Sequence, residues 1–162
     1  MMAEMKIPRV MIAAPGSGSG KTMITCGLLE LLRCEGHPVS FKCGPDYIDP
    51  MFHRFVLGIP SRNLDTFFTA ANRTRRLMGQ ACMNTAADFA LIEGVMGYYD
   101  GLGGVSLQGS SYELSVQTKT PVLLVVNGRG MSLSMMALIR GFMDMYSDQM
   151  IRGVIMNRVS KA

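Results

Sequence analysis

The sequence lacks any apolar run long enough to span a membrane. The run from Val122 to Val126 is typical of its longest aliphatic segments, and a helix needs roughly 20 apolar residues to cross a bilayer. The apolar residues near the N-terminus lead directly into a glycine-rich turn, so no secretory signal is predicted. We therefore expect a cytoplasmic protein with no membrane partner.

The sequence also lacks the cysteine and histidine patterns of metal-binding or thiol-dependent sites. Its four cysteines show no CxxC spacing, and its two histidines, His37 and His53, form no Cys–His site by spacing. Reduced, mostly packed thiols are typical of a cytoplasmic protein. The cysteines are Cys26, Cys34, Cys43 and Cys82.

Charge is sparse and slightly positive. Charged residues make up 17% of the chain and hydrophobic residues 48%, with a net charge of +4. This balance is typical of one globular domain spanning residues 1–162. The basic cluster Arg73–Arg76 has no interleaved aromatic residues and predicts a solvated helix face, so no nucleic-acid partner is expected. The positive balance can help attract a polyanionic small molecule.

Strand-like and helix-like segments alternate along the chain. Alternation of this kind predicts an α/β protein, with a doubly wound, mostly parallel sheet and its ligands at the carboxyl ends of the strands. The expected strands are Val10–Ala14, Val39–Cys43, Phe89–Glu93, Val122–Asn127 and Gly153–Asn157. Helical patterns cover Met23–Arg33, Arg75–Met83 and Met135–Met143.

A glycine-rich segment follows the first expected strand and precedes the first expected helix. This context predicts a phosphate-binding loop in which Lys21 reaches the outer phosphates of ATP and the Thr22 hydroxyl ligates Mg²⁺. The strict pattern has glycine where this chain has Pro15, so the loop is a variant, and a glycine-rich turn that merely contains Gly-Lys-Thr is the alternative. The predicted nucleotide-binding residues are Gly16, Ser17, Gly18, Ser19, Gly20, Lys21 and Thr22.

Charged residues also occur where the second and third expected strands end. Lys42 and Asp46 follow one strand, and Glu93 ends the next. Asp46 and Glu93 can supply carboxylates to Mg²⁺, together with the Thr22 hydroxyl. Taken alone, each acid is equally well explained as a turn-capping carboxylate and Lys42 as a surface lysine. Their occurrence together at successive strand ends favours function.

Two signatures resemble the cobyrinic acid a,c-diamide synthase family. They are Gly-Pro-Asp-Tyr-Ile-Asp-Pro at 44–50 and Glu-Gly-Val-Met-Gly-Tyr-Tyr-Asp-Gly at 93–101, and the resemblance runs from about Val10 to Val159. It implies a dethiobiotin-synthetase-like phosphate-loop protein. It also implies ATP-dependent amidation of corrinoid carboxylates during cobalamin synthesis. The carboxylate is phosphorylated first, and nitrogen from glutamine or ammonia then displaces phosphate.

The resemblance also implies roles for individual residues. Lys42 would neutralise charge on the phosphoryl group or the substrate carboxylate, alongside Asp46 and Glu93 in catalysis. Asp100 would be a catalytic acid near the substrate that steers ammonia or the intermediate, and Tyr47 and Ile48 would meet the macrocycle. Asn157 resembles an adenine-reading asparagine of related folds, with a strand-end turn asparagine as the equal alternative.

The chain departs from the family in two respects. The family has Asp after the fourth expected strand, Val122–Asn127, where this chain has Asn127, which puts any charge role there in doubt. Full-length members also carry a C-terminal glutaminase domain, and no glutaminase triad is recognisable here. We therefore expect residues 1–162 to be the N-terminal synthetase portion. The oligomeric state stays open, with a homodimer among the alternatives.

Three functions remain open at this point. The favoured one is the synthetase part of a corrinoid amidotransferase, with hydrogenobyrinate or nickel-sirohydrochlorin as alternative substrates. The second is a nucleotide-switch ATPase of the partitioning type, but that class carries an additional lysine early in its loop, where this chain has Gly16. The third is an ATP-binding fragment without catalytic activity.

Overall fold

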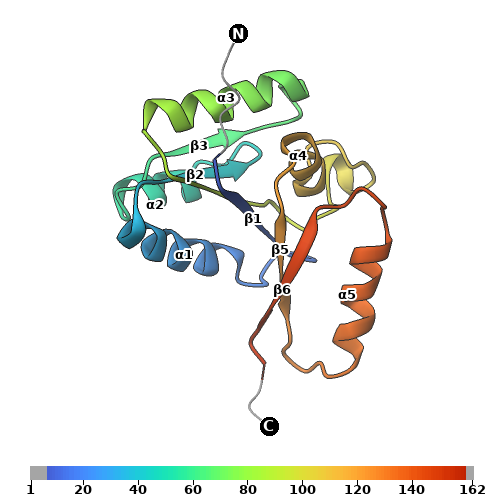
Figure 1. Cartoon of the computed structure of the whole chain (residues 1–162). Coiled ribbons are helices and arrows are strands. Elements are labelled where there is room, and N and C mark those ends of the chain that lie inside the picture. The colour runs from blue at the N-terminus through green and yellow to red at the C-terminus, as the bar shows by residue number, and fades with distance from the viewer. Residues whose placement is uncertain (1–6, 160–162) are drawn as a thin grey trace.

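A computed structural model describes residues 7–159 of the chain. All pairings in its six-stranded sheet are parallel, in the order β3-β2-β4-β1-β5-β6 (Figure 1). The strands are β1 (Arg9–Ala13), β2 (Pro38–Cys43), β3 (Ser61–Leu64), β4 (Phe89–Glu93), β5 (Val122–Asn127) and β6 (Ile151–Asn157). The helices are α1 (Lys21–Glu35), α2 (Ile48–Phe55), α3 (Ala71–Asn84), α4 (Ser111–Thr118) and α5 (Ser134–Asp144), with a 3₁₀ turn, η1, at Leu102–Gly104. The predicted fold class is confirmed.

Helices cover both faces of the sheet, which explains why its central strands carry mostly apolar residues on both faces. Alternate residues of β1 enter different cores: Met11 packs in the cluster that includes Leu114 of α4, and Ile12 packs in the cluster that includes Leu29 of α1. All six residues of β2 are buried. Strands buried on both faces read as continuous apolar runs instead of alternating ones.

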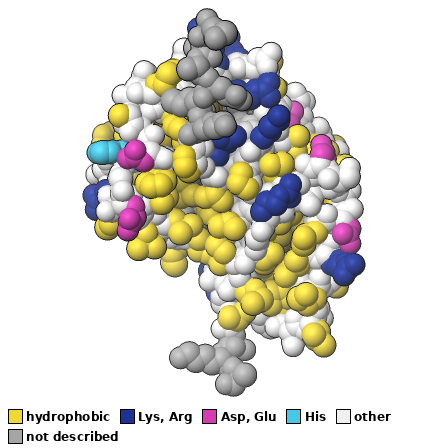
Figure 2. All heavy atoms as spheres, viewed as in Figure 1, with side chains coloured by type: hydrophobic (Ala, Val, Ile, Leu, Met, Phe, Trp, Pro, Cys, Tyr) yellow, Lys and Arg dark blue, Asp and Glu magenta, His cyan; other side chains and the backbone are white. Residues whose placement is uncertain are grey.

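The outer strand β6 is less enclosed. Its residues are mostly half-buried, and Figure 2 shows apolar side chains gathered over the region of α1 and β6. Ile155 of β6 and Ile24 of α1 are partly buried hydrophobic residues of this region. Within residues 7–159, no helix is long and apolar enough to cross a membrane.

All five predicted strands are present, but no pattern in the sequence predicts β3, α2 or α4. Strand β3 has only four residues, and its two central residues, Arg62 and Asn63, are exposed, as befits the edge of a sheet. Helix α2 contains Pro50, and α4 is a short, largely polar helix. None of the three shows the long apolar periodicity on which sequence-based prediction depends.

The strand order places the functional candidates at one end of the sheet. Strand β1 lies between β4 and β5, so the chain changes winding direction there, and ligands bind at such a switch point. In the β2–β4 pairing, Lys42 and Glu93 are direct partners. In the β1–β4 pairing, Glu93 is the partner of Ile12. Ile12 lies near the end of β1, shortly before the glycine-rich loop.

Candidate functional site: a phosphate loop and a buried lysine–carboxylate cluster

The loop between β1 and α1 is shaped by glycines in conformations that other residues avoid. Gly18 and Gly20 have φ values of 75° and 99°, which lie in the left-handed region. Gly20 is the N-cap of α1, and no side chain caps this helix. The first amide groups of α1 and the positive end of its dipole are therefore available to an anion.

Two side-chain hydrogen bonds hold this loop in shape. Ser19 Oγ donates to the carbonyl of Gly16 at 2.9 Å, and Asn157 Nδ2 donates to the carbonyl of Ser19 at 2.9 Å. A Cβ added at Gly20 would lie 2.4 Å from Asn157 Nδ2, so the close approach also requires glycine here. Asn157 thus joins the end of β6 to the loop, and its predicted contact with adenine stays a prediction.

The side chain of Lys21 connects the phosphate loop with the loop that follows β4. Its Nζ donates to the carbonyl of Met96 at 2.6 Å and to that of Gly16 at 3.3 Å. Burial lowers the pKa of Lys21, and the neighbouring ammonium of Lys42 lowers it further. The side chain therefore bridges the phosphate loop and the loop after β4, and its predicted contact with the outer phosphates of ATP stays a prediction.

Glu93 is fully buried at the end of β4. Its Oε1 accepts hydrogen bonds from Thr22 Oγ1 at 2.6 Å and from Lys42 Nζ at 3.1 Å. Burial raises the pKa of the Glu93 carboxyl, and the Lys42 ammonium opposes that shift. Contact with an ammonium and a hydroxyl donor favours the ionised carboxylate.

Lys42 is the cation at the centre of this cluster. Its side chain is only 6% exposed, and its Nζ lies 2.5 Å from Asp49 Oδ2, 3.1 Å from Glu93 Oε1 and 3.7 Å from Asp46 Oδ2. Burial lowers its pKa, but the carboxylates of Glu93 and Asp49 more than offset this, and the net shift is upward. Lys42 is therefore charged, and the alternative of a surface lysine is wrong.

Asp46 caps a helix and also lies beside Lys42, and its predicted contact with magnesium stays a prediction. Its Oδ1 accepts from the backbone N–H of Ile48 at 2.8 Å and of Asp49 at 3.3 Å, which caps the start of α2. Its other oxygen faces Lys42 and the phosphate cavity. Asp49 was not singled out as a site residue. It follows Asp46 by three residues, and only the formation of α2 turns it toward Lys42.

Asp100 stabilises the loop that follows β4. Its Oδ2 accepts from the backbone N–H of Gly97 at 3.0 Å. A Cβ at Gly97 would meet both this carboxylate and the carbonyl of Pro15 at under 3 Å, so this loop and the phosphate loop approach closely. Asp100 is not among the described residues that line the phosphate cavity, and its predicted catalytic function stays a prediction.

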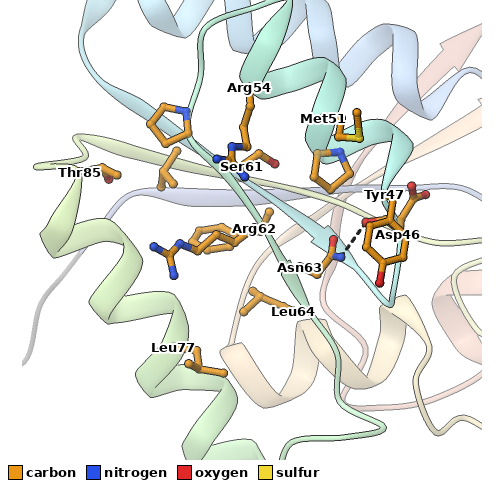
Figure 3. A pocket seen from close by; sticks show the side chains of 14 residues that line it. Asp46, Tyr47, Met51, Arg54, Ser61, Arg62, Asn63, Leu64, Leu77 and Thr85 are labelled. Atoms are coloured by element: carbon orange, nitrogen blue, oxygen red, sulfur yellow. Dashed lines mark hydrogen bonds between the residues drawn. The ribbon is translucent and has the colours of Figure 1, made fainter.

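Tyr47 and Ile48 are both 79% exposed at the start of α2. Tyr47 and Asp46 lie at one end of a hollow of about 540 Å³ that extends along β3 (Figure 3). Asn63 Nδ2 holds this end by donating to the carbonyl of Asp46 at 2.7 Å. The two residues expected to meet the macrocycle are therefore accessible, beside the cluster and outside it.

Two further residues lie where β5 and β6 end. Asn127 Oδ1 accepts from the backbone N–H of Arg129 at 3.1 Å, so this asparagine caps the turn after β5. Arg158 follows β6, with a φ of 56°, and lines the phosphate cavity. Sequence reasoning missed Arg158, because nothing local distinguishes it from a surface arginine.

One cavity brings most of the predicted residues together. Its volume is about 450 Å³, and it is bounded by the phosphate loop, the start of α1 and the ends of β2 and β4. Its lining includes Ser17, Gly18, Gly20, Lys21, Thr22, Lys42, Asp46 and Glu93. Segments far apart in the sequence thus converge on a site with a positive loop and carboxylates at its rear.

The oxygen donors of this cavity fit a magnesium ion. The Thr22 hydroxyl and Glu93 Oε1 are 2.6 Å apart, and Asp46 lines the same cavity. Among the described residues, no group of three or more His, Cys, Asp or Glu side chains could hold a metal. This donor set suits Mg²⁺, which binds through few protein oxygens together with phosphates and water.

Comparison with protein families identifies a matching model. The description "CobQ/CobB/MinD/ParA nucleotide binding domain" matches residues 10–162. A cobyrinate a,c-diamide synthase of Thermoplasma acidophilum is 42% identical over 96% of the chain, and one of Priestia megaterium is 43% identical over 93%. A hydrogenobyrinate a,c-diamide synthase of Mycobacterium bovis is 44% identical over 98%. The chain spans 33–35% of the length of these relatives.

Solved structures support the fold independently. The kinase domain of Escherichia coli tyrosine kinase ETK aligns with a TM-score of 0.57 at 13% identity, covering 99% of this chain and 72% of that one. The hydrogenase maturation factor HypB of Archaeoglobus fulgidus aligns at 0.51 and 18% identity, covering 93% and 81%. At these identities the likeness concerns the fold alone.

Proposed function

The chain belongs to the CobQ/CobB/MinD/ParA nucleotide-binding domain family, and on that premise we propose that it is the ATP-binding synthetase part of an a,c-diamide synthase. Its substrate is cobyrinate or hydrogenobyrinate, the corrinoids in the names of its relatives. A single observation carries the proposal: Lys21, Thr22, Lys42, Asp46 and Glu93 line one cavity beside the phosphate loop.

The proposed reaction has two steps. A carboxylate oxygen of the corrinoid attacks the γ-phosphorus of ATP, the bond from that phosphorus to the β–γ bridging oxygen breaks, and ADP leaves. Ammonia then attacks the carbonyl carbon of the acyl phosphate, and the bond from that carbon to the former carboxylate oxygen breaks. Phosphate leaves with this oxygen and the bonding electron pair, and it takes up the proton that the nitrogen loses. Positioning and charge neutralisation dominate such chemistry, because the phosphoryl group itself needs little covalent help from the protein.

Lys21 and Lys42 would neutralise negative charge at two different places in the site. Lys21 exchanges the carbonyls of Met96 and Gly16 for the outer phosphates of ATP. Lys42 is fixed by Glu93 and Asp49, so its ammonium is preorganised near the position where the substrate carboxylate meets the γ-phosphate. Preorganised charge stabilises the transition state without reorganisation at the moment of reaction.

Thr22, Asp46 and Glu93 would hold magnesium with the nucleotide. The ion would supply charge neutralisation on the β- and γ-phosphate oxygens. Thr22 and Glu93 already share a hydrogen bond at the bottom of the cavity, and their oxygen atoms would turn from each other toward the metal.

The corrinoid would bind over the exposed start of α2. Tyr47 and Ile48 offer apolar contact to a macrocycle, and the adjacent hollow includes Arg54 and Arg62, whose guanidinium groups suit a ligand with several carboxylates (Figure 3). Asp100, in the loop after β4, would lie near the substrate and steer ammonia or the intermediate. A glutaminase domain in the longer protein would supply ammonia.

Calorimetry tests the nucleotide part of this proposal. We expect Mg·ATP to bind to the wild-type chain and to bind at least about tenfold more weakly to Lys21→Ala, the effect of losing a charge-assisted contact to phosphate. Lys119→Ala is the matched control, because this exposed lysine ends α4, before the amino end of β5. Equal ATP affinity in wild type and Lys21→Ala would exclude Lys21 from the site.

Mass spectrometry tests the substrate part. The full-length protein, supplied with cobyrinate, Mg·ATP and glutamine, should form mono- and diamide products with the release of ADP and phosphate. Parallel reactions with hydrogenobyrinate and nickel-sirohydrochlorin compare the alternative tetrapyrroles. Nucleotide binding without amidation of any of the three would favour a nucleotide switch instead of a synthetase.

A further inference from the structure

A buried histidine lies directly behind Glu93. His53 of α2 is 0% exposed, as is Glu93. Its ring Nε2 lies 3.8 Å from Glu93 Oε2. Neither of these two buried atoms has a hydrogen-bond partner among the described residues. Buried polar atoms are nearly always paired, so two facing orphans at this distance require an explanation.

The other ring nitrogen of His53 is engaged. His53 Nδ1 lies 2.8 Å from the hydroxyl of Ser40, a fully buried residue of β2. When the hydroxyl donates to Nδ1, the neutral imidazole carries its proton on Nε2, the atom that faces Glu93. Burial lowers the pKa of His53, in agreement with a neutral ring.

Glu93 needs a donor on the side that His53 faces. Its Oε1 is occupied by Thr22 and Lys42, both on the cavity side. Its Oε2 points away from these donors toward the ring. A proton on His53 Nε2 would satisfy both orphaned atoms, through a closer approach or through one bridging water molecule.

We propose that His53 is a positioning residue: its Nε2–H binds Glu93 Oε2 and so holds Oε1 toward Thr22 and the phosphate cavity. Ser40 fixes the tautomer from the opposite side of the ring. Side chains that hydrogen-bond metal-binding carboxylates orient them, and their loss costs about 10–100-fold in metal affinity or activity. The inference rests on the proposed function only where it treats Glu93 as a magnesium ligand.

Two substitutions separate the two ring nitrogens. The side-chain amide of His53→Asn can replace Nδ1 opposite Ser40 but leaves Glu93 Oε2 without a donor. The longer amide of His53→Gln can place an N–H near the position of Nε2. We expect His53→Asn to weaken Mg²⁺-dependent ATP binding at least about tenfold, with metal-free ATP binding within about threefold, and His53→Gln to restore most of the loss.

The control is His37→Asn, the same substitution at the other histidine of the chain. His37 is exposed and pairs with Asp88 on the surface, so its substitution should leave nucleotide and magnesium binding unchanged. Calorimetry of ATP with and without Mg²⁺ measures all four proteins. Equal Mg²⁺ dependence in wild type and His53→Asn would overturn the inference.

A spectroscopic measurement tests the proton placement without nucleotide or metal. In a protein labelled with ¹⁵N-histidine, long-range ¹H–¹⁵N spectra distinguish the two tautomers, and His37→Asn identifies the His53 signals by leaving only those. We expect an Nε2–H tautomer in wild type and a mixture of tautomers in Ser40→Ala. A proton on Nδ1 in the wild-type protein would overturn the inference, even if His53→Asn failed to fold. Failure of wild type to bind Mg·ATP would instead count against the proposed function.

Discussion

Among single substitutions in the cluster around Lys42, we expect removal of the Lys42 ammonium to destabilise the folded protein most. Lys42→Met keeps the length of the side chain but leaves Glu93, which is fully buried, without its cationic partner at 3.1 Å. Asp49 loses its partner as well, but its side chain is 16% exposed and can still reach water. The cost therefore falls mainly on Glu93.

The expected loss is large relative to the stability of a domain. Removing one member of a buried ion pair costs about 3–5 kcal/mol, against a total of about 5–15 kcal/mol for folding. For a domain of this size, 1 kcal/mol corresponds to about 2–4 °C in Tm, so Lys42→Met should lower Tm by roughly 10 °C. Adding Glu93→Gln removes the stranded charge, and the double variant should recover at least about half of the loss.

The loss should depend on pH with a defined sign. Burial raises the pKa of Glu93 above its ordinary value of 4.5, and Lys42 opposes this shift. Without Lys42 the folded-state pKa rises further, so the folded protein binds protons more tightly than the unfolded chain does. The contribution of Glu93 to the stability of Lys42→Met should therefore be greatest below about pH 4.5 and be lost as the pH rises through the raised pKa.

Urea unfolding followed by circular dichroism at pH 4 and pH 7 measures these effects. Wild type, Lys42→Met, Glu93→Gln and the double variant form a thermodynamic cycle, which isolates the interaction between the two side chains. A loss below about 1 kcal/mol at pH 7 for Lys42→Met, the upper end of what an exposed ion pair typically contributes, would refute the reasoning. So would a double variant less stable than Lys42→Met alone.

Three further predictions follow from the site and its loop. In the full-length enzyme, Glu93→Gln should abolish Mg²⁺-dependent ATP turnover while preserving the circular dichroism spectrum; unchanged turnover at saturating Mg²⁺ would remove Glu93 from the metal site. Gly20→Ala should weaken ATP binding and lower stability, because the added Cβ would lie 2.4 Å from Asn157 Nδ2 and the φ of residue 20 is 99°. Gly27→Ala is the control: nothing lies within 4 Å of an added Cβ there, and alanine favours the helix, so this variant should be more stable by up to about 1 kcal/mol. Residues 1–162 alone should release no glutamate from glutamine above a protein-free control. With ammonium salts they should amidate cobyrinate weakly or not at all, since remote contacts that position the substrate contribute to rate as well as affinity. Glutamate release well above the control would contradict the assignment of glutamine hydrolysis to a separate domain.

Much of the architecture was readable from the sequence because it depends on local pattern and chain order. Continuous apolar runs predicted all five long strands, and helical spacing between them predicted a parallel sheet with helices on both faces. The glycine-rich turn between Ala14 and Lys21 required only a strand before it and a helix after it. Parallel strands place their carboxyl ends at one edge, so Lys42 and Glu93 were expected near the phosphate loop before any contact was known.

The tertiary structure alone decided which side chains meet. The register of β2 against β4 makes Lys42 and Glu93 neighbours, and the short helix α2 carries Asp49 and His53 into contact with them. Helix α2 has too few residues and too little apolar periodicity to be predicted, so the sequence could not indicate which of its polar residues face inward. The cluster arises from contacts between segments tens of residues apart. These contacts, which no local pattern records, keep Lys42 charged through the neighbouring carboxylates and place a buried histidine opposite Glu93.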